Sequence, residues 1–199
     1  MANTVAVPPF TDERPSELYD HTALMLVPLV LYYSVYADKV EERLPEKISQ
    51  FNPLEDIPKA LAAELQNRRF FKSAFFAQSD REGELVLRGK LTSTKFEETG
   101  YSYGVSLFLV YFYALGLPMA TGWNELIFSL QLEEPQSHTV LWHKTYTAKD
   151  SGTRGAWYGP RNSLWYDAML KKLMPTILSD VEAAMSAMAS PGGGTTKRP

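Results

Sequence analysis

The chain has 199 residues, a length that suits one domain of ordinary size. Hydrophobic residues make up 45%, which is enough for a packed core, and the aromatic share is high at 13%. A formal net charge of −3, with basic residues placed beside acidic ones, argues against a nucleic-acid surface, and the absence of cysteine excludes a disulfide scaffold, a thiol nucleophile and a cysteine-ligated zinc site.

The N-terminal part combines a short strand with an unusual apolar segment. Val5–Phe10 predicts a buried strand, which two prolines end before a charged turn at Thr11–Pro15. Ala23–Tyr36 is apolar and carries no charged residue. It is too short to cross a bilayer as a helix, and Pro28 in its middle breaks any regular helix there.

A helix is predicted next, and its starting residue is open. Asn52 can cap a helix that begins at Pro53, whereas Pro58 favours a start near Asp56, because proline is tolerated in the first turn. A strand over Phe70–Phe76 follows the helix. Apolar residues at spacings of three and four mark the buried face of the helix: Leu54, Ile57, Leu61 and Leu65.

Alternating patterns predict three further strands. Glu84–Phe96 has one apolar and one mostly polar face, which is typical of a sheet with one wet face or of an edge strand. Asn124–Glu133 and Thr139–Ala148 predict a hairpin, and Asp150–Gly155 predicts a loop. The inward face of the first of these strands carries Leu85, Leu87, Gly89 and Leu91.

A second apolar segment, Tyr101–Trp123, separates these strands. Its central run from Leu107 to Leu115 has no charged residue, and Gly116 and Pro118 end it. The length of this run lies between those of a strand and a helix, so its periodicity does not separate the two.

The C-terminal element is a long helix. Asn162 or Ser163 can cap it, and Pro175 should kink or split it. The pattern as a whole predicts one domain over 1–190 and a flexible tail over 191–199. The expected fold class is α/β (α+β): a mixed β-sheet packed by two main helices, with two apolar insertions.

No residue pattern with a catalytic or metal-binding mechanism is present, so we expect no enzyme activity, no cofactor and no metal. His138 and His143 are five residues apart on an expected strand and would point to opposite faces. The hydrolase elbow and the phosphate-binding loops are absent. Asp12 and Arg14 remain as a loop candidate for binding, because they follow the first strand, and the alternative is a surface turn.

The two apolar segments are the main candidates for a binding surface. A small domain has few places where such segments can be buried on all sides, and large exposed apolar patches mark partner or membrane surfaces. Core packing and an interface both remain open, and an interface requires the two segments to lie close together. The residues proposed to bind are Leu29, Tyr32, Tyr33, Tyr36, Phe108, Tyr111, Phe112, Tyr113 and Trp123.

Four short stretches in chain order resemble a group of bacterial envelope lipoproteins. The first is VAVPPFTDERP, from Val5 to Pro15. The other three are Ala60–Leu65, Leu85–Gly89 and the strand from Val140 to Tyr146. Together they are similar to the TolB amino-terminal domain and the curli-secretion lipoprotein.

This resemblance implies a non-enzymatic, lipid-anchored protein at the periplasmic face of the outer membrane, with an accessory or assembly role in secretion, transport or envelope maintenance. The expectation supposes a leader and an anchor cysteine outside the printed sequence. The expected partners are a protein, a second copy of the chain or the membrane, and no nucleic acid. The alternative is a periplasmic binding module for a lipid or another apolar small molecule.

Overall fold

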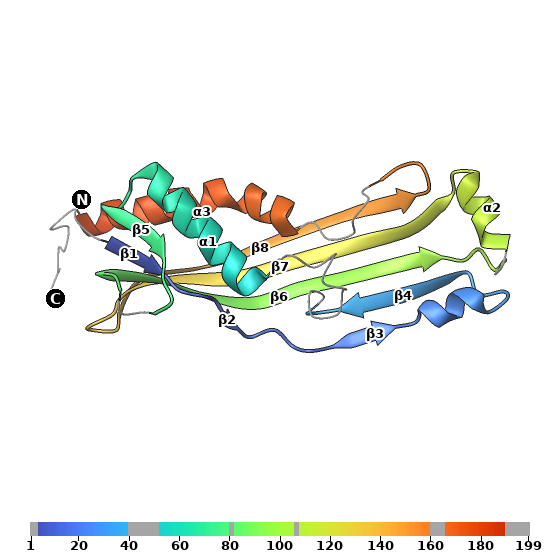
Figure 1. Ribbon diagram of the computed structural model, residues 1–199, viewed down its shortest axis with the longest axis horizontal. Coiled ribbons are helices and arrows are strands. Elements are labelled where there is room, and N and C mark those ends of the chain that lie inside the picture. Colours follow the sequence, from blue (N-terminus) through green and yellow to red (C-terminus); the bar gives the residue numbers. More distant parts are fainter. Residues whose placement is uncertain (1–3, 40–51, 80–81, 106–107, 160–165, 190–199) are drawn as a thin grey trace, which may run out of the picture.

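The computed structural model describes residues 4–39, 52–79, 82–105, 108–159 and 166–189. These residues form one mixed eight-stranded sheet with α-helices packed on it, so the α+β class predicted from the sequence is confirmed (Figure 1). The predicted helix cap at Asn162 or Ser163, Leu107 of the second apolar segment and the tail 191–199 lie outside the described residues.

The elements follow one another along the chain as strands with four helical segments between them. They are β1 (Thr4–Val7), β2 (Thr11–Asp12), β3 (Leu18–Asp20), the 3-10 helix η1 (Thr22–Leu26), β4 (Tyr32–Ala37), α1 (Pro53–Arg68), β5 (Ser73–Phe76), β6 (Leu85–Tyr101), α2 (Leu109–Ala114), β7 (Pro118–Glu134), β8 (Thr139–Gly155) and α3 (Tyr166–Ala189).

Strand β6 lies in the middle of the sheet. Along one edge it pairs with β1 and β2 in parallel and then with β4 antiparallel, and its other edge pairs with β7, which pairs in turn with β8. The edge-strand alternative for this segment is therefore wrong, and the one-wet-face alternative is confirmed, since Lys90 and Thr92 are exposed. A register shift between Leu91 and Ser93 moves the inward positions from odd to even residue numbers.

Helices α1 and α3 cover one face of the sheet at one end of the molecule (Figure 1). The core lies between them and the sheet, and each fully buried large apolar side chain contributes roughly 1.5–3 kcal/mol there. The largest fully buried side chains include Ile57, Leu61 and Leu65 of α1, Leu87 and Leu91 of β6, Leu126, Phe128, Leu130 and Leu132 of β7, and Met169 and Ile177 of α3.

Helix α1 begins at Pro53, with the Asn52 side chain accepting a hydrogen bond from the Leu54 amide, so the alternative start at Asp56 is wrong. Pro58 lies inside the helix and has no N–H to donate to the Leu54 carbonyl. The backbone N–H of Phe10 donates to that carbonyl instead, at 2.8 Å. The helix thereby tolerates its proline, and the loop after β1 is tied to it.

Three expectations from the sequence need correction. Asp150–Gly155 is not a loop but the end of β8, because it continues the antiparallel pairing with β7, with Asp150 opposite Asn124 and Arg154 opposite Ala120. The strand expected at Phe70 begins only at Ser73. Helix α3 is not split at Pro175 but continues as one helix of 24 residues, and the alternative of a kink at Pro175 stays a prediction.

Strands β6, β7 and β8 extend well past α1 and α3 and, with β3 and β4, form an arm (Figure 1). Helices η1 and α2 lie at its far end. On the arm the Tyr33 ring lies against Gly100, where an added Cβ would stand 2.1 Å from the ring. Glycine is required at this position because the aromatic ring occupies the space of a side chain.

Candidate functional site

The two apolar segments predicted from the sequence meet at the far end of the arm. The Leu29 amide donates to the Gly104 carbonyl at 3.1 Å, the Gly104 amide to the Val30 carbonyl at 2.9 Å, and the Ser102 amide to the Leu31 carbonyl at 2.9 Å. The expectation that the segments lie close together is confirmed. The second segment contains both strand ends and the six-residue helix α2, which explains why its period was ambiguous.

A third segment, residues 155–159, contacts the second apolar segment at the end of the arm, and it was not among the segments predicted from the sequence. Trp157 Nε1 donates to the Ala114 carbonyl at 3.0 Å, and the Gly155 amide donates to the Tyr158 carbonyl at 2.9 Å. These bonds hold two exposed aromatic side chains, Trp157 and Tyr158, beside α2. The signal that could have found them is an uncharged aromatic run directly after a strand.

Residues 22–32, 101–105, 108–118 and 155–159 of these segments form a surface that we call the apolar tip, and the rest of the first two segments, along β4 and β7, belongs to the arm. Several of its side chains are almost fully exposed, including Leu29 at 86%, Leu115 at 79% and Trp157 at 77%. Monomeric soluble proteins rarely expose so many large apolar side chains in one place. The exposed side chains of the tip are Leu24, Leu26, Val27, Leu29, Leu31, Tyr32, Phe108, Val110, Tyr111, Leu115, Trp157 and Tyr158.

The apolar tip contains no acidic or basic residue. None occurs over 22–37, 101–124 or 155–159. The nearest charged residues along the chain lie on the arm, and the ion pair between Arg154 and Glu98, at 3.0 Å, is among them. These ranges therefore bring no charged side chain to the tip, and the exposed His21, the N-cap of η1, directly precedes the first of them.

Polar side chains within the tip turn inward to backbone carbonyls. The Ser102 hydroxyl donates to Val30 at 2.5 Å, the Tyr103 hydroxyl to Pro118 at 2.7 Å, and the Tyr113 hydroxyl to Tyr101 at 2.7 Å. Burial raises the pKa of Tyr113 to about 12. These hydroxyls are bonded inside the tip, so the outside of the tip consists of aliphatic side chains, Phe108, Trp157 and the three exposed tyrosines Tyr32, Tyr111 and Tyr158.

The predicted binding residues divide into two groups. Leu29, Tyr32, Phe108 and Tyr111 are exposed on the tip, where Phe112 and Tyr113 pack beneath them against Tyr103. The others lie on strands of the arm rather than on the tip. These are Tyr33 over Gly100, Tyr36 bonded to Asp38, and Trp123 between the amines of Lys95 and Lys149. Binding by either group remains a prediction.

Leu29 has a left-handed backbone with φ +70°. This conformation is unfavourable for a residue with a bulky side chain and costs of order 1–2 kcal/mol. Glycine or asparagine would adopt it more easily. In this strained turn the Leu29 side chain points outward, and it is the most exposed large apolar side chain among the described residues.

Asp12 and Arg14, the loop candidate, form a buried structural contact. Arg14 Nε lies 2.9 Å from Asp12 Oδ1, and Arg14 Nη1 donates to Thr94 Oγ1 at 2.6 Å. Lys39 also pairs with Asp12, at 3.0 Å. The Arg14 side chain is only 1% exposed. These contacts tie the loop after β2 to β6.

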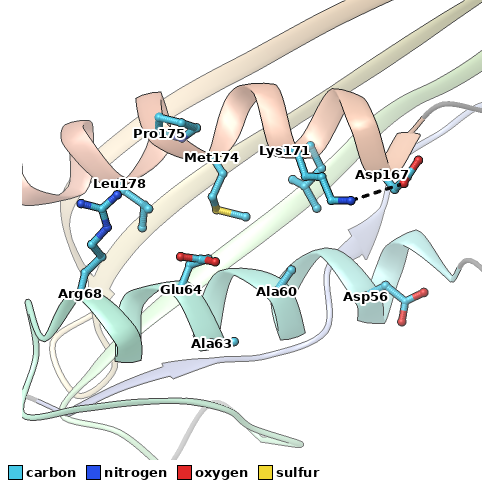
Figure 2. Close-up of a pocket in the computed structure, with 11 residues that line it drawn as sticks. Asp56, Ala60, Ala63, Glu64, Arg68, Asp167, Lys171, Met174, Pro175 and Leu178 are labelled. Atoms are coloured by element: carbon cyan, nitrogen blue, oxygen red, sulfur yellow. Dashed lines mark ion pairs between the residues drawn. The ribbon is translucent and has the colours of Figure 1, made fainter.

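A groove of about 580 Å³ lies between α1 and α3, away from the apolar tip (Figure 2). Met174 points into it from α3 toward α1, and charged side chains stand along its rim, including the ion pair of Lys171 with Asp167. Its apolar lining consists of Ala60, Ala63, Leu170, Met174, Pro175 and Leu178. From the sequence we expected any apolar pocket to be lined by the two apolar segments, whereas this groove is lined by residues of α1 and α3.

Within the described ranges, no cluster of three or more His, Asp or Glu side chains is arranged to hold a metal ion. His138 lies in the turn after β7 with φ +54°, so the strand argument made for it from the sequence does not apply. Across the same residues, every helix is too short or too polar to cross a membrane.

Comparisons with known proteins give likenesses of structure alone. No family model and no curated protein matches the chain. A DUF330 protein from Xanthomonas campestris is 7% identical with a TM-score of 0.42, covering 94% of this chain and 90% of that one. A hypothetical protein from Chlamydia trachomatis is 10% identical with a TM-score of 0.41, covering 94% and 99%.

A lipoprotein from Neisseria meningitidis is 13% identical with a TM-score of 0.26, and the match covers 94% of this chain and 97% of that one. At these identities and TM-scores the matches assign neither a family nor a function. The resemblance to the TolB amino-terminal domain therefore stays a prediction from the sequence.

Replacing Asp12 with Asn removes the charge opposite buried Arg14, so we expect the free energy of unfolding to fall by about 3 kcal/mol at neutral pH. The hydrogen bonds from Arg14 hold the pKa of Asp12 well below its ordinary value. A lowered folded-state pKa contributes stability that is complete above the unfolded pKa of about 4 and is lost as the pH falls below it.

Urea unfolding of wild type and Asp12→Asn should therefore show a constant stability gap from about pH 7 to pH 5 and a narrowing gap below about pH 4. Glu13→Gln is the control, because Glu13 and Lys90 form an exposed pair that should contribute less than about 1 kcal/mol. A gap of the same size at every pH would contradict the assignment.

Proposed function

We propose that this chain is a non-enzymatic accessory protein of the bacterial cell envelope that docks through its apolar tip. The observation that carries the proposal is the convergence of three chain-distant segments into one uncharged, exposed apolar surface. Exposing this surface to water is unfavourable, and burying it against a partner or a membrane recovers that free energy.

The core and the tip have different tasks in this proposal. Helices α1 and α3 stabilise one end of the sheet, and the long strands β6, β7 and β8 hold the tip away from them (Figure 1). A docking surface on a rigid scaffold is held in one geometry before it meets its target, which lowers the entropic cost of binding.

The envelope location and the lipid anchor rest on the short stretches between Val5 and Tyr146 that resemble envelope lipoproteins. Both parts of the proposal are tested by growing cells that express the whole gene with labelled palmitate and then fractionating their membranes. We expect label in the protein and sedimentation with the outer membrane, and an unlabelled protein in the soluble fraction would contradict the anchor.

Phe108→Ser and Tyr111→Ser should weaken docking without weakening the fold, because both side chains are more than 60% exposed. We expect the purified variants to lose most of their co-sedimentation with isolated envelope membranes. Their free energy of unfolding should change by no more than about 0.5 kcal/mol.

Val140→Ser is the matched control, since Val140 is a half-exposed apolar residue on β8 outside the tip. It should co-sediment like wild type. If Phe108→Ser unfolds the domain, or stays folded and co-sediments like wild type, the tip is not the docking surface.

A second candidate function, binding of an apolar small molecule, is favoured by the groove between α1 and α3. Its volume of about 580 Å³ lies in the range of pockets for small ligands. Ala63→Phe places a large side chain in the groove from an exposed position and should abolish binding of the fluorescent probe N-phenyl-1-naphthylamine. Asn67→Phe, at a position of α1 outside the groove lining, should keep it, and equal binding by both variants would exclude the groove.

A further inference from the structure

We propose that the apolar tip inserts into the interfacial region of a lipid bilayer, without contributing charge. This inference rests on the proposed docking function and commits it to lipid as the target. The tip would enter the boundary between headgroups and acyl chains, with the arm standing outside in water.

The tip satisfies many of its polar groups by internal hydrogen bonds. A hydrocarbon environment offers no hydrogen-bond partners, so a surface that enters it must satisfy its own polar groups. Backbone amides across the tip donate to carbonyls of the tip itself, and the hydroxyls of Ser102, Tyr103 and Tyr113 do the same. The indole N–H of exposed Trp157 is also bonded internally, to Ala114.

Charged side chains are absent from the tip segments. Charged groups are expensive to bring toward hydrocarbon, and the three tip segments carry none over 22–37, 101–124 and 155–159. Charged or titratable residues resume close to the ends of the segments in the sequence: Asp20, His21, Asp38, Glu98, Glu125, Arg154 and Arg161. This boundary sets how deep the protein can go, and tyrosine and tryptophan at the tip suit a membrane interface.

A protein target would favour a different surface. Protein interfaces carry a polar rim and about one direct hydrogen bond per 100–200 Å² of contact. The tip has instead turned the hydroxyls of Ser102, Tyr103 and Tyr113 inward and lacks charged residues in its segments, so the side-chain groups it offers such a partner are mainly the hydroxyls of the exposed Tyr32, Tyr111 and Tyr158.

The turn at Leu29 places an exposed leucine at the tip in an unfavourable backbone conformation. A leucine occupies a left-handed position that favours glycine or asparagine, and its side chain is 86% exposed. Strain that persists at an exposed apolar residue indicates a requirement other than stability of the fold. Insertion of that side chain among lipid chains meets this requirement.

Flotation of the purified protein with phosphatidylcholine vesicles tests the inference directly. We expect binding to these neutral vesicles, with no more than a twofold change between 0.1 M and 1 M NaCl or on adding about a third phosphatidylglycerol, because no protein charge takes part. Binding only to anionic vesicles at low salt would overturn the inference in favour of electrostatic adsorption.

Brominated lipids locate the contact. Trp157 should be quenched by bromine near the headgroup end of the acyl chains, and the quenching of bound protein should disappear in Trp157→Phe. Trp123 and Trp142 lie in β7 and β8 and should stay unquenched, and Trp165, the fourth tryptophan, lies outside the described residues and is replaced with phenylalanine in every sample. Quenching of bound protein that survives in Trp157→Phe would show that another surface touches the lipid.

Leu29→Asn separates binding from folding. Asparagine fits the left-handed backbone, so we expect an unfolding temperature equal to or above that of wild type. The loss of one inserted leucine should weaken vesicle binding by about tenfold. Val140→Asn, the matched control, should bind like wild type, and unchanged binding by Leu29→Asn would overturn the inference.

The two proposals fail in different ways. If Phe108→Ser abolishes co-sedimentation with envelope membranes while wild type ignores vesicles of pure lipid, the tip docks on a protein and the inference fails. If Phe108→Ser sediments with envelope membranes like wild type, the docking function itself fails.

Discussion

The pairing of β6 along both of its edges is the constraint on which the structure depends. Its first half joins β1 to β7 and completes the core beneath α1 and α3, and its second half joins β4 to β7 and carries the arm. The shift between Leu91 and Ser93 lets this one strand serve both parts, because it resets which side chains face inward. Thr94, which accepts the buried hydrogen bond from Arg14, follows this register shift directly in the sequence of β6.

Local patterns in the sequence predicted much of the fold. The alternation from Leu85 to Leu91, the hairpin of β7 and β8, and the helix capped by Asn52 all depend on residues near one another in the chain. The end of β8 could not be predicted this way. Asp150 and Arg154 look like loop residues until their pairing with Asn124 and Ala120 of β7, which are distant in sequence, is known.

The candidate site was predicted in part, for a related reason. Apolar composition marked both segments of the tip, but a core segment has the same composition, and only the placement of α1 and α3 at the other end of the sheet decides which is exposed (Figure 1). Trp157 and Tyr158 were missed because their place in the tip follows from a long-range bond to Ala114. Tyr36 and Trp123 were included because composition alone does not separate the tip from the arm.

The hydrogen bond from Phe10 to Leu54 has a consequence for how the molecule forms. An ordinary helix completes its own backbone ladder, but α1 has a gap at Pro58 that only the segment after β1 fills. The helix and the first strand therefore depend on each other for satisfied backbone groups, and they should open and close as one cooperative unit. The Leu54 carbonyl, which the helix cannot use itself, thus binds the segment that follows β1.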